Sequence, residues 1–309
     1  MRRPAPLLLP ALAAALLLSA CGTERAAGTG TGGPGTGTPS PATQVTDPGI
    51  DGVRITSVTI PSPSPSPERS LSVTADRLPA DSGISAAYEV TNQGTEAMTY
   101  TIIVNFTNSA GEVMGNKRET VRAVGAGKTV RGTVHLGTVA PGSSSVTRAA
   151  VSDVTKVPAQ EAPAEAGDCP ASGVRVFADQ GDAAMGLRVV GLHLQNCGTR
   201  DYSVDGYPLL ELLDDNREPV DGVEILKGSG EITTGAGPDE APEPVTLKPG
   251  ETALASLVWR NTTQSGTAVN VPYVRVRAKE GADPVVVTPG LDLGTTGKLG
   301  VRPWKRAAQ

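Results

Sequence analysis

The sequence predicts an all-β protein built from two antiparallel β-sandwiches in tandem, and three observations support this fold class. Short runs rich in Val, Ile and Thr recur about every ten residues, turn residues such as Asn, Gly and Pro separate them, and no segment beyond the N-terminal leader shows a convincing helical period. A short Pro- and Ala-rich stretch at 159–167, expected to be a linker, divides the runs into two sets. We therefore expect one sandwich over residues 51–158 and a second over 168–305.

The first sandwich is expected to contain about seven strands. Ala86, Tyr88 and Val90 alternate with more polar positions such as Glu89, a pattern typical of a strand with one face toward solvent. The recognisable runs lie at 53–60, 84–91, 99–107, 113–124, 130–136 and 146–157.

The second sandwich is expected to repeat the plan of the first. Asn92-x-Gly94 ends one predicted strand, and Asn196-Cys-Gly198 ends another in the second set. A polar turn follows at a similar spacing, at Gly111 and at Asp215. Two related sandwiches explain this echo better than a solenoid, since stacked repeats usually need three or more units. The expected strands are 174–177, 185–195, 209–213, 220–226, 252–260, 273–278 and 285–288.

The N-terminus predicts export. Arg2 and Arg3 precede an apolar run over 7–18, which is shorter than the roughly 20 residues needed to span a bilayer as a helix. A basic start, a short apolar core and small residues before a cleavage site are typical of a secretory signal, here residues 1–20. The run ends in Leu18-Ser19-Ala20-Cys21, which resembles the lipobox of bacterial lipoproteins.

This resemblance implies that Cys21 becomes the acylated N-terminus after cleavage behind Ala20. An ordinary secretory signal with Cys21 as an incidental thiol is the alternative. The next stretch, 21–50, is rich in Gly, Thr, Pro and Ala, and a segment with so few large apolar side chains is expected to be a disordered tether. A flexible coil of about 28 residues has an r.m.s. span of roughly 30 Å.

Composition narrows the possible partners. The 309-residue chain has a net charge of −5 and a sequence pI of about 5.2, so no broad basic face for nucleic acid or anionic lipid is expected. Membrane attachment would therefore depend on the lipid at Cys21. Of the three cysteines, Cys169 and Cys197 remain as a pair, which indicates a compartment outside the reducing cytosol.

Two resemblances extend over the folded part. Tyr88-x-Val90-Thr-Asn92 resembles the small immunoglobulin-like domains of bacterial lipoproteins, over about 51–158. The second half is similar to the actinobacterial exported family called domain of unknown function 4232, over about 168–305. The resemblance implies a β-sandwich, places the family's paired cysteines on Cys169 and Cys197, and carries no catalytic residues. Its motifs are Leu194-Gln-Asn-Cys197-Gly, Gly206-Tyr-Pro208, Leu212-Leu-Asp214, Leu257-Val-Trp259-Arg-Asn261-Thr, Leu293-Gly-Thr-Thr-Gly297 and Pro303-Trp304.

Patterns that suggest catalysis or nucleotide binding fail in their context. The glycines at 30–35 match a dinucleotide fingerprint, but no strand precedes them and no helix follows. Residues 125–129, Gly-Ala-Gly-Lys-Thr, suggest a phosphate loop, but Arg122 replaces its first glycine and a strand follows, so a hairpin is expected. His135 and His193 lie in different domains and are expected to be solvated strand residues. No zinc-peptidase or serine-hydrolase motif occurs.

Acidic and aromatic residues leave weaker alternatives open. Asp214-Asp-Asn216-Arg-Glu218 spaces its oxygen groups as calcium loops do, but Pro219 stands where such a loop needs glycine, which favours a hairpin turn. The polar loop 228–244 carries Asp239, Glu240 and Glu243, which are expected to be solvated. An aromatic sugar-binding platform is less expected than core packing for the six aromatics of the second half: Phe177, Tyr202, Tyr207, Trp259, Tyr273 and Trp304.

The sequence therefore predicts a lipid-anchored, extracytoplasmic lipoprotein of the cell membrane that acts as a non-catalytic binding module for an envelope protein or ligand. It predicts no catalytic, cofactor-binding or metal-binding residues. Loops 228–244 and 196–208 are the candidate binding loops. The alternatives are a cell-wall hydrolase that uses paired carboxylates and a structural or accessory subunit of an envelope complex.

Overall fold

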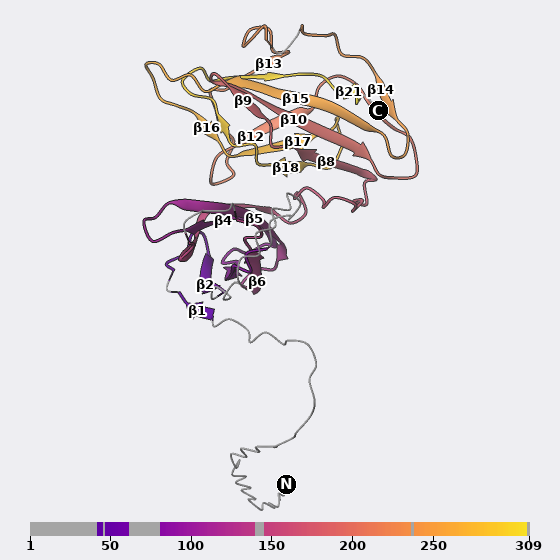
Figure 1. Ribbon diagram of the computed structural model, residues 1–309. Coiled ribbons are helices and arrows are strands. Elements are labelled where there is room, and N and C mark those ends of the chain that lie inside the picture. The colour runs from indigo at the N-terminus through magenta and orange to yellow at the C-terminus, as the bar shows by residue number, and fades with distance from the viewer. Residues whose placement is uncertain (1–41, 46, 62–80, 140–144, 236–237, 308–309) are drawn as a thin grey trace, which may run out of the picture. The chain divides into compact units, whose positions relative to one another are not determined.

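The computed structural model describes residues 42–45, 47–61, 81–139, 145–235 and 238–307 (Figure 1). Two predicted segments, the signal at 1–20 and the lipidation site Cys21, lie outside these residues, as does the predicted tether up to residue 41. In the described part every regular element is a β-strand, and almost all strand pairs are antiparallel. The predicted all-β fold class is therefore confirmed.

The first sandwich packs one four-stranded sheet against one three-stranded sheet. The sheets have the orders β1-β2-β3-β6 and β5-β4-β7. In β4, Ile102, Val104 and Phe106 are fully buried and alternate with less buried residues, because successive side chains of a strand point to opposite faces. The strands are β1 (Ala42–Gln44), β2 (Val53–Thr59), β3 (Ser85–Thr91), β4 (Met98–Thr107), β5 (Val113–Val124), β6 (Thr129–His135) and β7 (Arg148–Pro158).

The second sandwich is built on a seven-stranded sheet whose main path is β13-β20-β15-β10-β8. The sheet β12-β17-β18 and the pairs β11-β14 and β16-β19 complete it, and β13-β20 is a parallel pair. Its strands are β8 (Val174–Ala178), β9 (Asp182–Ala184), β10 (Leu187–Asn196), β11 (Tyr202–Val204), β12 (Leu209–Leu213), β13 (Glu224–Lys227), β14 (Val245–Leu247), β15 (Thr252–Arg260), β16 (Asn270–Val271), β17 (Tyr273–Arg277), β18 (Val285–Val287), β19 (Leu291–Asp292), β20 (Lys298–Val301) and β21 (Lys305–Arg306).

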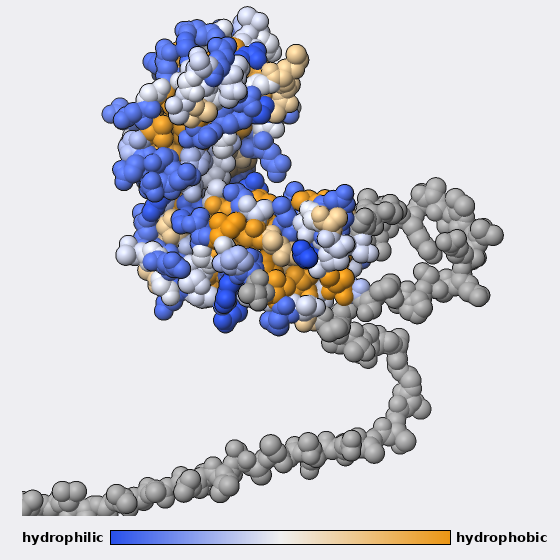
Figure 2. Space-filling model, turned by 90° about the vertical axis from the view of Figure 1, so that its left-hand side faces the viewer, coloured by the Kyte–Doolittle hydropathy of each residue, from blue (hydrophilic) through white to orange (hydrophobic). Residues whose placement is uncertain are grey.

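Each sandwich has its own apolar core, and a third, small cluster joins Val157 of β7 to Leu213, Tyr273 and Val286 of the second sandwich. In the second sandwich, Leu192 and Leu257 from the large sheet and Val276 from β17 share one fully buried cluster. Trp304, expected to close the sandwich, is also buried there, and its indole N–H donates to the Ala278 carbonyl at 2.9 Å. In the view of Figure 2, apolar residues gather over the first sandwich, whereas polar residues cover most of the second.

The predicted repetition of one plan is visible in the strand register. In the first sandwich β3 is the central partner of β2 and β6, and in the second β10 is the central partner of β8 and β15. Val90 pairs with Val53 and Val130, two positions before Asn92. Leu194 likewise pairs with Val176 and Ala253, two positions before Asn196. The echo in the sequence therefore marks equivalent ends of equivalent strands.

Three details differ from the expectations. β1 lies inside the segment 21–50 that was expected to be a tether, because the free edge of β2 gives this polar segment a pairing partner. The hairpin expected at 125–129 is wrong, because residues 125–128 join β5 to β6 and these two strands belong to different sheets. Glu89 was expected to face solvent and is only 7% exposed, since arginines from both neighbouring strands cover it.

The expected linker at 159–167 packs against the second sandwich. Its Glu161 carboxylate accepts a hydrogen bond from the Arg275 guanidinium at 2.9 Å. The backbone N–H of Val286 donates to the Glu161 carbonyl at 2.7 Å. The segment is therefore fixed to the β17–β18 sheet by both its side chain and its backbone.

Candidate functional site

Most of the family motifs form corners of the second sandwich. Asn196 is 1% exposed, and its side-chain amide donates to the carbonyls of Arg200 and Leu247, each at 2.8 Å. Its side-chain oxygen accepts the Gly198 N–H at 3.1 Å. The backbone N–H of Gly250 also donates to the Asn196 carbonyl. This motif therefore satisfies buried backbone groups where the strand ends.

The first sandwich contains the same corner. The Asn92 amide donates to the carbonyls of Glu96 and Val124, each at 2.7 Å, and its oxygen accepts the Gly94 N–H at 2.9 Å. Gly127 donates to the Asn92 carbonyl, as Gly250 does to Asn196. The two corners are equivalent in every one of these hydrogen bonds.

The acidic run 214–218 forms a turn, as the sequence favoured. The Asp214 carboxylate accepts the backbone N–H groups of Asn216 and Glu218, each at 2.8 Å. In the first sandwich, Asn108 accepts the N–H groups of Ala110 and Glu112 in the same pattern. The Asp214 oxygen is therefore used for the turn. In the described residues no group of three or more His, Cys, Asp or Glu side chains is placed to hold a metal ion.

The motifs around Trp259 and Leu293 meet at Asp292. Its carboxylate accepts the Trp259 indole N–H at 2.7 Å and the Asn261 side-chain amide at 3.0 Å, while the Arg188 guanidinium lies 3.4 Å away. The Thr295 hydroxyl accepts the backbone N–H of Gln264 at 2.9 Å. These contacts tie the connection after β15 to the segment around β19.

The two predicted cysteines are bonded to each other. The Cys169–Cys197 disulfide joins Cα atoms 5.6 Å apart. It attaches the segment before β8 to the corner formed by Asn196, because Cys197 directly follows that residue. The predicted pairing is therefore confirmed, and it holds the start of the second sandwich in place.

Of the two candidate loops, 228–244 is anchored by its own acid. The Asp239 carboxylate accepts the backbone N–H of Ser229 at 2.6 Å and that of Gly230 at 2.7 Å, and these bonds lower its pKa. Glu240 forms an ion pair with Lys305. Asp239 and Glu240 are exposed, as expected, and each also has a defined protein partner. Glu243 is exposed, as expected.

The two histidines lie apart, as the sequence indicated. His135 is exposed on β6 of the first sandwich. On β10, the His193 ring stacks on Phe177 with centroids 4.7 Å apart, and its Nε2 lies 3.1 Å from the Asp179 carboxylate. His193 was expected to face solvent, but these two neighbours on the β8 side of the sheet half-bury it.

The aromatic side chains of the second sandwich do not form one exposed platform. Trp259, Tyr273 and Trp304 are buried, in agreement with the preference for core packing. Tyr207 and Tyr202 are each covered by a lysine, with the Lys279 Nζ 4.2 Å from the centroid of Tyr202. Tyr202 belongs to the second candidate loop, 196–208, and the face of its ring is covered by the Lys279 side chain.

A cavity with a volume of about 700 Å³ lies beside Tyr202. It lies at the edge of the second sandwich, where β8 of the large sheet comes close to β18 of the facing sheet. Pockets of 300–1,000 Å³ with mostly apolar walls are typical of small-molecule sites. Its apolar lining consists of Ala162, Ala164, Pro170, Ala171, Val174, Val176, Tyr202, Ala278, Ala282, Pro284 and Val285.

The walls of this cavity are held from several sides. The segment 160–164 forms one wall and is fixed by the contacts of Glu161 with Arg275 and Val286. Residues 170–172 form another and follow the disulfide-bonded Cys169 directly. Preformed walls lower the entropy lost when a ligand is bound, which favours a binding role.

Charged side chains line part of the cavity: Glu161 lies in the segment 160–164, and three others lie in the segment 278–285. Lys279, Glu280 and Asp283 come from the β17–β18 turn, and the Lys279 Nζ donates to the Ser203 carbonyl at 2.7 Å. Burial raises the pKa of the Tyr202 phenol above its usual value of 10.0, and Asp283 raises it further. Tyr202 is therefore neutral at physiological pH and available as a hydrogen-bond donor or acceptor.

No sequence pattern predicted this cavity. Its lining comes from four separated segments, 160–164, 170–176, Tyr202 and 278–285, and most of the residues are Ala, Pro or Val, which carry no chemical signal of their own. A partial signal was the Ala- and Pro-rich composition of 159–167, which was interpreted as a linker.

Comparison with protein families identifies one domain in this chain. Residues 169–305 match the family described as Domain of unknown function (DUF4232). The second sandwich therefore contains a DUF4232 domain, as its motifs indicated. No curated protein matches this chain. Among the described residues, no helix has the length and apolar character needed to cross a membrane.

Proposed function

We propose that the protein is a lipid-anchored, extracytoplasmic binding module that captures an apolar small molecule in the cavity of the second sandwich. The cavity itself supports the proposed class of ligand, because it has a volume of about 700 Å³ and mainly aliphatic walls. The lipobox-like sequence ending at Cys21 supports the anchor, and the Cys169–Cys197 disulfide supports an oxidising compartment.

A blocking substitution tests the binding role. Ala171 lines the cavity and is exposed, so Ala171→Trp is expected to fill its mouth without disturbing the core. The neutral fluorophore N-phenyl-1-naphthylamine serves as the probe, and its fluorescence rises when it enters an apolar site. We expect saturable binding to the full chain and a loss of at least about tenfold in affinity in the variant, equal to about 1.4 kcal/mol.

A matched control separates the cavity from general surface binding. Ala268 is also exposed but lies in the loop after β15, outside the cavity lining. Ala268→Trp is therefore expected to leave the affinity unchanged. Equal affinities of the wild-type chain and Ala171→Trp, or an absence of saturable binding, would refute the cavity as the ligand site.

The anchor is tested independently of the ligand. Cys21→Ala is expected to abolish incorporation of labelled fatty acid, because the thiol that would carry the lipid is gone. Cys169→Ala leaves that thiol in place and is expected to retain labelling. The Cys21→Ala chain is expected to remain as an uncleaved precursor, or to be released from the membrane if another peptidase cuts it, since stable attachment of the mature chain would need the acyl chains. A mature, labelled Cys21→Ala protein would contradict the anchor.

A further inference from the structure

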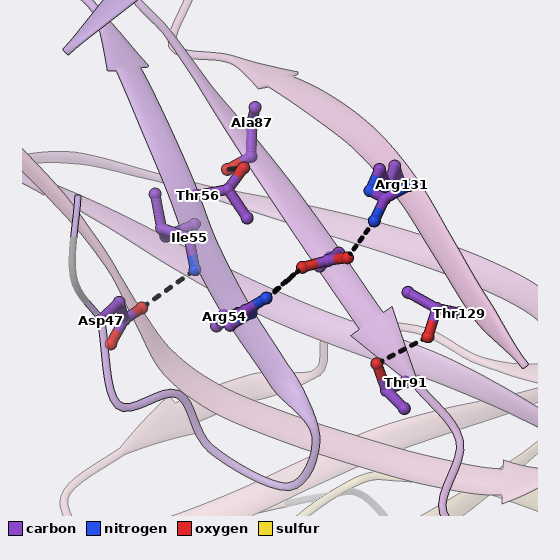
Figure 3. A network of polar contacts seen from close by, with 9 residues as sticks. Asp47, Arg54, Ile55, Thr56, Ala87, Thr91, Thr129 and Arg131 are labelled. Carbon is purple, nitrogen blue, oxygen red and sulfur yellow. Dashed lines mark hydrogen bonds and ion pairs between the residues drawn. The ribbon is translucent and has the colours of Figure 1, made fainter. Parts of the chain in front are cut away.

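A cluster of charged side chains lies on the outer face of the first sandwich, away from its core. Glu89 stands on the central strand β3, and its cross-strand neighbours are Arg54 on β2 and Arg131 on β6. Figure 3 shows the two guanidinium groups on opposite sides of one carboxylate. The side chain of Glu89 is 9% exposed, whereas those of Arg54 and Arg131 are 60% and 80% exposed.

The Glu89 carboxylate does not occupy all the hydrogen-bond donors of the two guanidinium groups. Arg54 donates through Nε and Nη2 to one Glu89 oxygen, at 3.1 and 2.6 Å, and Arg131 donates through Nη2 to the other at 2.7 Å. Each guanidinium has five N–H donors, so both keep donors that face solvent. The row therefore carries one excess positive charge on the surface of a chain whose net charge is −5.

Hydroxyl groups surround this row. The Thr91 and Thr129 hydroxyls lie 2.9 Å apart in the next row of the sheet, and Thr56 lies on the other side (Figure 3). Threonine hydroxyls can donate and accept hydrogen bonds, so they suit a ligand that carries hydroxyls of its own. Thr133 and His135, both exposed, continue the polar face along β6.

A hollow of about 460 Å³ adjoins the row and is lined by Arg54, Glu89, Thr91 and Thr129. Gly52 lies in its wall with φ of +82°, and a Cβ there would lie 2.4 Å from the Thr91 carbonyl oxygen. Residue 52 therefore cannot carry a side chain, so none projects from this part of the wall into the hollow. The other acid of the hollow, Asp51, is paired with Lys156 at 3.0 Å, so the two acids are both neutralised by cations.

We propose that this face, centred on Arg54 and Arg131, binds an acidic polysaccharide. A sugar carboxylate would accept hydrogen bonds from the exposed guanidinium donors, and the ring hydroxyls would meet the threonines around the hollow. A plain anion would use the arginines alone. The threonine hydroxyls on both sides of the arginines, the Thr91–Thr129 pair on one side and Thr56 on the other, are the feature that favours a sugar. This site is separate from the apolar cavity of the second sandwich, so either proposal can fail without the other.

The test measures binding of a fluorescently labelled oligogalacturonate to the full chain by anisotropy at low salt, with labelled dextran as the neutral probe. The double variant Arg54→Gln/Arg131→Gln is expected to weaken binding by roughly tenfold or more, because charge-assisted hydrogen bonds are lost. Arg118→Gln removes one positive charge from an exposed position on β5, as Arg131→Gln alone does from β6, and is expected to change the affinity by less than about twofold.

Folding of the variants is checked by circular dichroism. If the double variant unfolds, Arg131→Gln alone decides, since this side chain is 80% exposed and makes one hydrogen bond to Glu89. Several-fold weaker binding by this folded variant supports the site. Equal binding of oligogalacturonate and dextran, or equal weakening by Arg118→Gln, overturns the proposal.

Discussion

Replacing Asn196 by alanine would remove the side chain that satisfies the corner of the second sandwich. Its amide donates to the carbonyls of Arg200 and Leu247 at 2.8 Å each, and its oxygen accepts the Gly198 N–H at 3.1 Å. A buried polar group left without a partner costs about 1–3 kcal/mol. The bond to Leu247 is fully buried and the other two are partly buried, so we expect a total loss of about 2–4 kcal/mol.

Tryptophan fluorescence provides a selective assay for this loss. The chain has two tryptophans, Trp259 and Trp304, and both are buried in the second sandwich. Their emission therefore follows the unfolding of that sandwich in urea. With a denaturant slope of about 2 kcal/mol per molar, the expected loss lowers the urea midpoint by about 1–2 M.

Asn92→Ala is the matched control, because Asn92 makes the equivalent hydrogen bonds in the first sandwich. It is expected to lower the stability of that sandwich, followed by circular dichroism, and to leave the tryptophan transition in place. The reasoning would be refuted if Asn196→Ala lowered the free energy of unfolding by less than about 0.5 kcal/mol. It would also be refuted if Asn92→Ala shifted the tryptophan transition as much.

Two further predictions concern the second sandwich. The double change Cys169→Ala/Cys197→Ala opens a loop with a sequence separation of 28 and is expected to cost about 3–4 kcal/mol in the tryptophan transition, whereas an unchanged midpoint would contradict a stabilising bridge. Asp239→Asn removes a carboxylate whose pKa is lowered by the N–H groups of Ser229 and Gly230, so its contribution is present at neutral pH and is lost as the pH falls below 3.8 through the lowered pKa. The variant should therefore show a flatter dependence of the urea midpoint on pH in this range, and an identical acid limb would contradict the assignment.

Several strands with turn residues on both sides could be predicted from the sequence. The predicted bounds 113–124, 209–213 and 252–260 agree with β5, β12 and β15. Turn residues such as Gly, Pro, Asn and Asp limit an element before any pairing partner is known.

Several other strands were missed, because they are short and form only where a neighbour offers free hydrogen-bonding groups. β14 has three residues and β19 has two, too few for a periodic signal. β1 contains Ala, Thr and Gln in a low-complexity stretch, and its pairing with β2 is what makes it a strand. Local sequence carries no information about such partners.

The candidate sites were also only partly predictable. The disulfide could be anticipated, because the predicted lipid attachment at Cys21 left two cysteines in a chain that was predicted to be exported. The burial of Glu89 depends on Arg54 and Arg131, which lie far from it in the sequence and meet it only through strand register. The cavity beside Tyr202 depends on the packing of small residues from distant segments, for which no spacing rule exists.

The repeated corner also shows where this fold accepts additional chain. The hydrogen bond from Gly127 to Asn92 closes one stretch, and the bond from Gly250 to Asn196 closes a longer one that includes the loop 228–244. Both stretches begin and end at equivalent points, so the extra residues enter and leave without altering the strands on either side. The corner is thus an insertion boundary. Sequence variation, or an engineered graft, can lengthen the chain between these points while the sandwich keeps its register.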